Sequence, residues 1–281
     1  MRYCIIIPAH NEAEFLPQLL ESICNQSKQP QEVVLVNDNS TDQTESIMQA
    51  YANKYPYIEY VNRASSQAHL PGGKIVEAFN FGFQQLKNTF DVIVKLDADL
   101  ILPNNYFYDL SRVFENPKIG IAGGFIYEQI AVGEWERNHP MKESHVRGAI
   151  KAYSRNCFEA IGGLRTAMGW DTVDELLALY HGFNVKTIPT LKVKHLRPTG
   201  KKYHSNAAIL QGKAFYQMRY GIILTKLAGI KVTLQKRSLF WIYGVLIGYF
   251  SAFINRAPFI VNSAEGRFIR NFRWRQIGSK S

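Results

Sequence analysis

Two aspartates one residue apart, Asp97 and Asp99, are the pair in this sequence whose type and spacing most directly predict chemistry. They follow an apolar run at residues 92–94 that is typical of a buried strand. If that strand continues through them, both carboxylates face one side, because side chains two residues apart along a strand point the same way. Proteins typically hold Mg²⁺ with one or two carboxylates together with substrate phosphates. The spacing therefore predicts a divalent-cation site, with a solvated Asp-x-Asp turn as the alternative.

The segments that must position this pair alternate between apolar runs and helical patterns. Residues 4–7, 32–36, 58–61 and 91–96 are expected as four strands, with amphipathic stretches between them. Such alternation predicts a parallel sheet flanked by helices, with ligands bound at the carboxyl ends of the strands. The residues collected at those ends are 8–11, Asp38, Arg63, Asp97 and Asp99.

The sequence also predicts two helix caps, one long loop and two short strands. Asn11 is a candidate cap for the first helix, with Glu14 at the offset of a capping box. Ser40 or Thr41 is the candidate cap for the second helix. Residues 128–144 are charged and irregular, which indicates a long loop over a site. Two short strands are expected at residues 184–188 and 191–195.

The composition is that of an ordinary globular protein, with 46% hydrophobic residues in a chain of 281. The net charge of +10 favours an anionic partner, such as a nucleotide, a nucleic acid or an acidic lipid surface. We expect no nucleic-acid partner, because no binding module is recognisable and the strand ends are partly acidic. Three cysteines that match no zinc spacing, and the lack of a secretory signal, indicate free thiols in a cytoplasmic protein.

The chain changes character after residue 200, which predicts a first domain at 1–200 and a basic, helical region at 201–281. Residues 239–254 are apolar and uncharged, with Lys and Arg on both sides. Sixteen residues are fewer than the ~20 that a spanning helix needs. Two interpretations remain. The helix lies among the headgroups of an anionic membrane, on its cytoplasmic face, or it docks against the first domain.

In this order and at this spacing, the motifs resemble those of family 2 glycosyltransferases, the inverting enzymes of the GT-A fold. The similarity covers residues 2–200. IIIPAHNE resembles the first nucleotide-binding loop of the family, and VNDNSTD resembles its V-D-D-G-S-T-D element, with Asn37 and Asn39 as departures. LDAD resembles the metal motif, and FEAIGGL resembles the stretch that precedes the acceptor site.

This resemblance implies a mostly parallel sheet flanked by helices, and transfer of a sugar from a nucleotide diphosphate sugar to an acceptor hydroxyl with inversion. The acceptor would be a glycan or a lipid-linked molecule in cell-surface glycan or glycolipid synthesis. Asp38 would hold the nucleotide base. The full set of implied nucleotide-sugar contacts is Pro8, His10, Glu12, Asp38, Arg63, Lys74 and Asp97. The implied ligands of Mg²⁺ or Mn²⁺ are Asp97, Asp99 and His195.

The resemblance also implies a catalytic base. In the family it usually stands in a Glu-Asp pair before a helix that ends in an Ala-Gly-Tyr-like turn. Residues 182–183 match that turn, and counting back without gaps places the pair on Trp170 and Asp171. Asp171 is therefore the expected base, and a shifted register would assign Asp174 or Glu175 instead.

Two alternatives belong to other classes of protein. A sugar-phosphate nucleotidyltransferase has a similar core, but it is expected to carry a Gly-rich loop with Arg after its first strand, and residues 8–12 contain no Gly. A non-catalytic, membrane-associated binding protein would keep most of the motifs. The presence of Asp38, Asp97, Asp99 and Asp171 together argues against it.

Overall fold

The computed structural model describes residues 1–65, 72–137, 144–197 and 206–278. In these residues one mixed sheet is formed by β1 (Tyr3–Ala9), β2 (Glu32–Asp38), β3 (Ile58–Arg63), β4 (Val92–Leu96), β5 (Leu100–Ile101), β6 (Ile119–Ala131), β7 (Glu134–Arg137), β8 (Ile150–Ser154) and β9 (Asn184–His195). The helices are α1 (Leu16–Cys24), α2 (Thr44–Lys54), α3 (Gly73–Gln84), α4 (Tyr106–Phe114), α5 (Arg155–Ala160), α6 (Trp170–Tyr180), α7 (Ala207–Gln217), α8 (Ile222–Lys236), α9 (Phe240–Ile254) and α10 (Ser263–Gly278).

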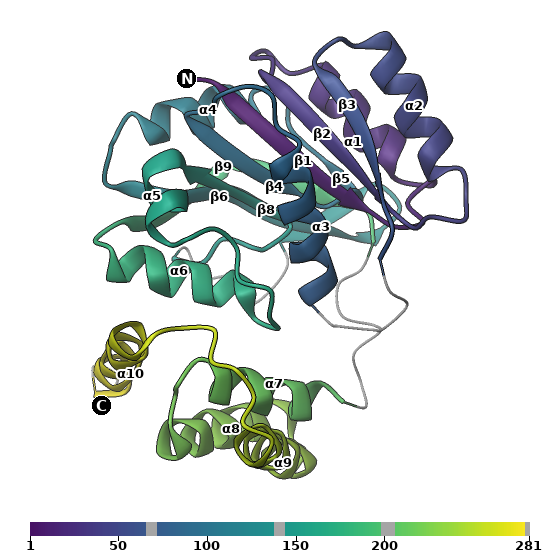
Figure 1. Cartoon of the computed structure of the whole chain (residues 1–281). Coiled ribbons are helices and arrows are strands. Elements are labelled where there is room, and N and C mark those ends of the chain that lie inside the picture. Colours follow the sequence, from purple (N-terminus) through teal and green to yellow (C-terminus); the bar gives the residue numbers. More distant parts are fainter. Residues whose placement is uncertain (66–71, 138–143, 198–205, 279–281) are drawn as a thin grey trace.

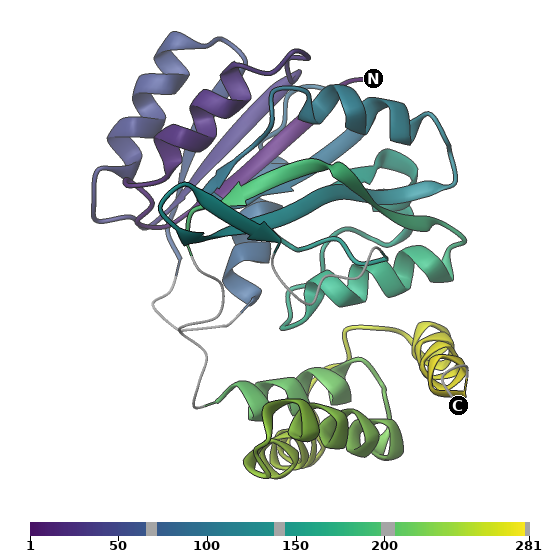
Figure 2. The same cartoon turned by 180° about the vertical axis from the view of Figure 1, so that it is seen from behind.

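The strands follow the order β3-β2-β1-β4-β8-β6-β9-β5, and β7 pairs with β6. Strands β3, β2, β1 and β4 are parallel, as expected from the alternation of apolar runs and helices. Helices α3 and α5 cover the face of the sheet that is turned to the viewer in Figure 1. Helices α1 and α4 cover the opposite face, which Figure 2 shows. The prediction of a mostly parallel sheet between helices is confirmed.

The central strands are apolar because both of their faces are covered. All seven residues of β1 are buried, which is the pattern of a parallel strand between two helical layers. Helix α3 packs closely on this part of the sheet at Gly82. A Cβ atom there would lie 2.6 Å from Val36 Cγ2 and 2.8 Å from Ile6 Cγ2. A larger residue would therefore push α3 away from the sheet.

The strand that precedes the aspartate pair ends where it was predicted to end, but it does not continue through the pair. β4 ends at Leu96, and the chain leaves the strand before it reaches Asp97 and Asp99. The backbone N–H of Asp97 donates to the carbonyl of Ala149 at 2.9 Å, and the carbonyl of Asp99 accepts from Leu196 at 2.9 Å. The condition for a common direction, a strand that continues through the pair, is therefore not met, and strand alternation does not set the directions of the two carboxylates.

The predicted loop at 128–144 is partly wrong. β6 continues to Ala131 and turns through Gly133, which has φ +80°, into β7. The charged residues of β7 lie on a short hairpin strand, so charge alone was a poor sign of irregular structure. Residues 138–143 of this prediction lie outside the described residues. The two short strands expected at 184–195 are one continuous strand, β9, beside β6.

The predicted helix caps are also wrong. α1 begins at Leu16 with Phe15 as its N-cap, and α2 begins at Thr44 with Gln43 as its N-cap. Asn11 adopts a left-handed conformation, φ 54°, and its side-chain carbonyl accepts from the N–H of Thr41 at 2.7 Å. Its side chain therefore joins the loops after β1 and β2 instead of capping a helix.

Helices α7 to α10 follow the sheet and lie together on one side of it. In both views α7 lies nearer to the sheet, and α8 and α9 form the outer layer (Figures 1 and 2). α10 packs beside α6, where the rings of Tyr180 and Phe268 are 5.5 Å apart. Across the described parts of the chain, no helix has the length and apolar character needed to cross a membrane.

Candidate active site

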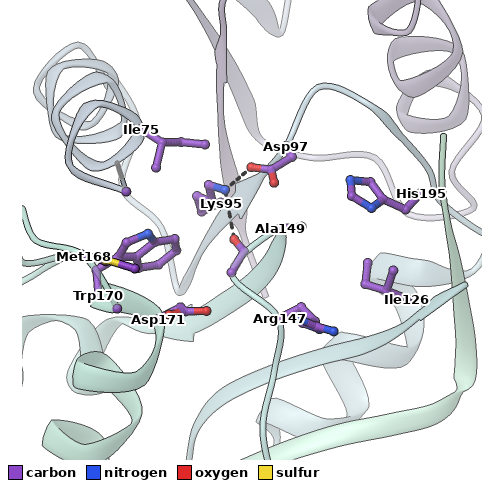
Figure 3. A pocket seen from close by; sticks show the side chains of 13 residues that line it. Ile75, Lys95, Asp97, Ile126, Arg147, Ala149, Met168, Trp170, Asp171 and His195 are labelled. Carbon is purple, nitrogen blue, oxygen red and sulfur yellow. Dashed lines mark hydrogen bonds and ion pairs between the residues drawn. The ribbon is translucent and has the colours of Figure 1, made fainter. Parts of the chain in front are cut away.

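A pocket of about 520 Å³ opens where the carboxyl end of β4 meets the N-terminal ends of α3 and α6. Figure 3 shows the side chains around it. Lys95 and Asp97 come from the end of β4, His195 from the end of β9, and Trp170 and Asp171 from the first turn of α6. Asp97 and His195 lie across the pocket from Asp171 (Figure 3). This is the edge of an open α/β sheet at which ligands are expected to bind.

The two aspartates of the Asp-x-Asp segment have different neighbours. Asp97 borders the pocket with 29% of its side chain exposed, and its Oδ1 forms a short ion pair with Lys95 Nζ. Asp99 is buried, and its Oδ1 lies 3.2 Å from His195 Nε2. The sequence motif therefore supplies one carboxylate to the pocket and one to a buried pair beside it.

The Asp99–His195 pair shifts the ionisation of both groups. Burial acts to raise the pKa of Asp99, but the hydrogen bond and charge of His195 outweigh it and lower the pKa. Burial likewise acts to lower the pKa of His195, and Asp99 outweighs it and raises the pKa. His195 Nδ1 is buried without a hydrogen-bond partner among the described residues, and Glu128 Oε1 lies 3.9 Å from it.

The chemistry of these donors fits a divalent cation. Carboxylates suit Mg²⁺ and Mn²⁺, and imidazole is a ligand of transition metals. A buried ring nitrogen without a partner, such as His195 Nδ1, is a group that a bound ion would satisfy. Within the described ranges, no three His, Cys, Asp or Glu side chains are grouped so as to hold a metal ion. Asp97 is turned toward Lys95 and would have to leave it to complete such a group.

The residues expected around the nucleotide base form a second group, at the ends of β1, β2 and β3. Asp38 pairs with Arg63 at 3.1 Å, and Arg63 also pairs with Glu77 at 2.7 Å. His10 Nδ1 lies 2.6 Å from the backbone carbonyl oxygen of Asp38. Pro8 is buried within β1, two residues before His10. The structure thus brings Asp38, Arg63 and His10 together.

Glu12 and Lys74 lie apart from that group. Both Nη atoms of Arg197 donate to the carboxylate of Glu12, at 3.0 and 2.7 Å. Burial raises the pKa of Glu12, although Arg197 acts against it. Arg197 Nε also lies 4.0 Å from Asp99 Oδ2, so Glu12 belongs to the Asp99–His195 cluster. Lys74 is half-buried in the first turn of α3 and is not one of the residues that line the pocket.

The three carboxylates of α6 differ in what they can reach. Asp171 borders the pocket and is partly exposed. Asp174 is 2% exposed and accepts from Lys151 Nζ at 2.7 Å. Glu175 is 7% exposed and accepts from the N–H of Val146 at 2.8 Å. Asp174 and Glu175 are therefore committed to a buried network, and Asp171 alone of the three borders the pocket.

Trp170 occupies the position at which the resemblance implies a glutamate, and it forms a wall of the pocket. Its ring lies 5.4 Å from Lys95 Nζ and 5.8 Å from Lys151 Nζ. Both cations are buried, so each ammonium gains from the negative face of the indole. Trp170 thus links the lysine beside Asp97 to the lysine that holds Asp174.

Our reasoning from the sequence missed three cations of the site: Lys95, Arg147 and Arg197. Arg147 lines the pocket, and Lys95 pairs with Asp97. A signal for Lys95 was available, because a lysine inside an otherwise apolar central strand needs a buried partner. No comparable signal marked Arg197, because its contact with Glu12 joins residues 185 positions apart.

Solved structures share this fold at low sequence identity. A mannosyltransferase from Pyrobaculum calidifontis, PcManGT, solved in complex with GDP-Man and Mn²⁺, superposes with a TM-score of 0.61 at 18% identity, over 97% of this chain and 80% of that one. S. aureus TarS in complex with UDP-GlcNAc superposes with a TM-score of 0.59 at 17% identity, over 83% of this chain and 67% of that one. These likenesses confirm the predicted GT-A fold.

Curated relatives are glycosyltransferases. The undecaprenyl-phosphate 4-deoxy-4-formamido-L-arabinose transferase of Pseudomonas fluorescens is 36% identical over 104 residues, which are 35% of this chain and 28% of that protein. The probable glycosyltransferase YdaM of Bacillus subtilis is 24% identical over 92% of this chain and 66% of its own length. The chain thus spans between 28% and 66% of the lengths of these two relatives.

The family assignment rests on the segment that contains the strand-end motifs. Residues 4–170 match the family described as Glycosyl transferase family 2. That segment is more than half of the chain, and it includes the Asp-x-Asp segment, the Asp38 group and Lys95. Its last residue is Trp170, immediately before the expected base. The chain belongs to glycosyl transferase family 2.

Proposed function

We propose that this protein transfers a sugar from a nucleotide diphosphate sugar to an acceptor hydroxyl, with inversion at the anomeric carbon. The observation that carries the proposal is the position of Asp171, which borders the pocket opposite Asp97 and His195. Inversion requires a base on one side of the reacting carbon and stabilisation of the departing diphosphate on the other. The pocket offers a carboxylate on one side and cation-binding or cationic groups on the other.

Asp171 is the proposed general base. Its carboxylate takes the proton of the acceptor hydroxyl as the oxygen attacks the anomeric carbon. Asp174 and Glu175 are unsuited to this role, because burial and bonds from Lys151, Val146 and Tyr153 keep them from the pocket. The gap-free register of the sequence motif is therefore the one that agrees with the geometry.

The donor nucleotide is proposed to lie along the carboxyl ends of β1, β2 and β3. Asp38 would hold the base, with His10 and Pro8 beside it, and Arg63 fixes the Asp38 carboxylate. Glu12 supports Arg197 next to Asp99. Lys74 is proposed as a phosphate contact from the first turn of α3, where the N-cap Gly72 and Ile75 line the pocket.

A divalent cation, Mg²⁺ or Mn²⁺, is proposed to be held by Asp99 and His195, with Asp97 completing the group. When bound, the ion would offset the negative charge that develops on the departing diphosphate. Lys95 competes with the ion for Asp97, because it already pairs with that carboxylate. Release of Lys95 from Asp97 would leave its ammonium in the pocket, where it can contact the diphosphate directly.

The acceptor is proposed to be a glycan or a lipid-linked molecule used in cell-surface glycan or glycolipid synthesis, on the cytoplasmic face of a membrane. Support comes from the name of one relative, which acts on undecaprenyl phosphate. The basic C-terminal helices also support it, because they favour an anionic surface. A first domain at residues 1–200, joined to a separate helical region at 201–281, is the proposed division of the chain.

The test is a donor screen that measures release of nucleotide diphosphate, with Mg²⁺ and Mn²⁺ in parallel and the Asp171→Asn variant as a control. The proposal requires release that depends on donor, metal and Asp171. Release of pyrophosphate from a nucleoside triphosphate and a sugar phosphate would indicate a nucleotidyltransferase instead. Donor binding without turnover across the acceptors offered would favour a non-catalytic binding protein.

A further inference from the structure

Helix α9 is apolar on every side, yet the structure buries only one side of it. The helix contains no charged residue in its 15 positions. A helix that is hydrophobic all round is normally buried all round. Here five large side chains on the outer side are 46–65% exposed: Phe240, Tyr243, Ile247, Phe250 and Phe253. This spacing of three or four residues places the first four of them on a single stripe.

The inner side of α9 packs against α7. Gly244, Gly248 and Ala252 are buried at intervals of four residues. A Cβ atom at Gly248 would lie 1.9 Å from the carbonyl oxygen of Ile209 in α7, so the two backbones are in direct contact. α9 cannot rotate to bury its outer stripe without separating this contact. The exposed stripe is therefore a fixed feature of the fold.

Helix α8, which lies beside α9, carries an exposed apolar stripe of its own. Ile223, Leu227, Ile230 and Leu234 are 38–72% exposed and are also spaced by four, three and four residues. α8 packs against α9, where Gly229 approaches Ile242. Both views place the two helices in the layer farthest from the sheet (Figures 1 and 2). We call the exposed apolar side chains of α8 and α9 the outer face.

The charge around the outer face has one sign. Residues 222–254 contain four cations and no Asp or Glu. These four cations are exposed, and the exposed Arg256 lies two residues after the end of α9. Within residues 201–281 there are 14 Lys and Arg and a single acid, Glu265, which is buried. The cations within 222–254 are Lys226, Lys231, Lys236 and Arg237.

We propose that the outer face docks on the surface of a membrane that contains anionic lipids, with α8 and α9 lying in the membrane plane. Each helix of 15 residues is about 22 Å long, shorter than the ~30 Å hydrocarbon core, so the helices lie on the membrane and do not cross it. The apolar stripes enter the boundary between headgroups and acyl chains, and the cations contact the lipid phosphates.

A second copy of this chain fits the outer face poorly. A two-fold contact through α8 and α9 would bring Lys226, Lys231 and Lys236 of both copies together with no carboxylate between them. Anionic lipid neutralises the same cations. The docking itself is independent of the proposed function. Its consequence for catalysis, an acceptor presented by the membrane, rests on that function.

The experiment measures co-sedimentation of the full chain with vesicles of phosphatidylcholine alone and of phosphatidylcholine with phosphatidylglycerol, at low and high salt. The full chain is expected to bind the mixed vesicles, and high salt should weaken this binding only in part. Lys231→Gln together with Lys236→Gln should lower the affinity at low salt by about fivefold per charge. Ile247→Glu should lower it by at least about tenfold at both salt concentrations.

The control is Val132→Glu, which places the same charge at a side chain that is 98% exposed in the turn between β6 and β7. It should bind vesicles as the unaltered chain does. Circular dichroism should show that Ile247→Glu keeps its helices. The proposal is overturned if the full chain ignores mixed vesicles at low salt, or if Val132→Glu loses binding as Ile247→Glu does.

A second readout is the mass of the chain in analytical ultracentrifugation. A dimer that Ile247→Glu abolishes would assign the outer face to a second copy and would also overturn the proposal. The vesicle assay contains neither donor nor acceptor, so it reports on docking alone. Donor-dependent release of nucleotide diphosphate without vesicles reports on the pocket alone. Failure of the docking proposal and failure of the proposed function are thus separate results.

Discussion

Residues 1–200 carry 19 Lys and Arg against 22 Asp and Glu, whereas residues 201–281 carry 14 Lys and Arg against one Glu. The first region buries charge and pairs it, as in the contacts of Asp99 with His195 and of Lys151 with Asp174. In the second region Lys226, Lys231, Lys236 and Arg237 are exposed, and α8 and α9 carry exposed apolar side chains. The net charge of +10 therefore says little about the pocket. It reflects the C-terminal helices, which are the part of the chain that favours an anionic surface.

The largest expected effect is in the pocket. Asp171→Asn should keep donor binding and lose about two to four orders of magnitude in turnover, the usual contribution of a general base. Steady-state kinetics and a separate donor-binding measurement would check it. Asp174→Asn is the matched control, and we expect it to act mainly on stability. If that variant loses turnover at normal stability while Asp171→Asn does not, the register of the base is wrong.

The next effect concerns the metal. Asp99→Asn should reduce transfer by more than about 100-fold, since loss of a ligand costs more than loss of its supporting partner, which costs 10–100-fold. Mn²⁺-dependent binding of the nucleotide should weaken in parallel, as titration calorimetry would show. Vesicle binding should not change, because Asp99 lies in the other region. Full activity of the variant, or full activity in excess chelator, would rule out this role.

A third prediction compares a buried cation with an exposed one. Lys151→Met leaves Asp174 and Glu175 without their cation and should lower the free energy of unfolding by about 3–5 kcal/mol. Lys231→Met, on the exposed side of α8, should change it by less than about 0.5 kcal/mol. Urea denaturation of both variants tests the contrast. Equal changes in the free energy of unfolding would mean that the buried, paired cation contributes no more to stability than the exposed one.

A fourth prediction separates packing from docking within α9. Gly248→Ala should push α9 away from α7 and destabilise the helices by about 1–3 kcal/mol, the usual effect of overpacking. Phe250→Ala, on the outer face, should weaken vesicle binding and leave stability nearly unchanged. Thermal unfolding and vesicle sedimentation distinguish the two. The assignment of the inner and outer sides fails if Phe250→Ala is the more destabilising variant.

The smallest effect is a pH dependence at the surface of the sheet. Asp91 accepts hydrogen bonds from Arg2, and these bonds lower the pKa of Asp91 to about 2. The contribution of this pair to stability is therefore present above the ordinary pKa of 3.8 and is lost as the pH falls toward 2. An NMR titration of the Asp91 carboxyl group in the unaltered chain and in Arg2→Gln should show the pKa return toward 3.8. An unchanged pKa would show that Arg2 does not cause the shift.

The parallel half of the sheet was predictable because its strands are buried on both faces and read as apolar runs. The polar groups at the edge of the sheet were also predictable in part, since His10, Asp38 and Arg63 stand at the ends of three adjacent strands and meet there. The direction of Asp97 and Asp99 was not, because it depends on contacts with Ala149 and Leu196 that lie far away in the sequence.

In the C-terminal helices, too, contacts between distant residues decide what the sequence pattern leaves open. The apolar run at 239–254 predicted a helix, and the structure has one at Phe240–Ile254. Its sequence could not say which side is buried, because both sides are apolar. The small residues Gly244, Gly248 and Ala252 decide it, by allowing contact with α7. Their significance depends on Ile209, which belongs to a different helix.

Arg165 joins the two regions just before α6 begins. Its guanidinium lies 3.5 Å from Glu265, the one acid of residues 201–281, and donates to the carbonyl of Ile260 at 3.0 Å. It also donates to Ile161 at 2.9 Å. With the outer face on a membrane, this contact would set the height of Asp171 above the lipid. The protein would then select acceptors by the distance between their reactive hydroxyl and the membrane surface. Acceptors that hold this hydroxyl nearer to the membrane or farther from it would react poorly.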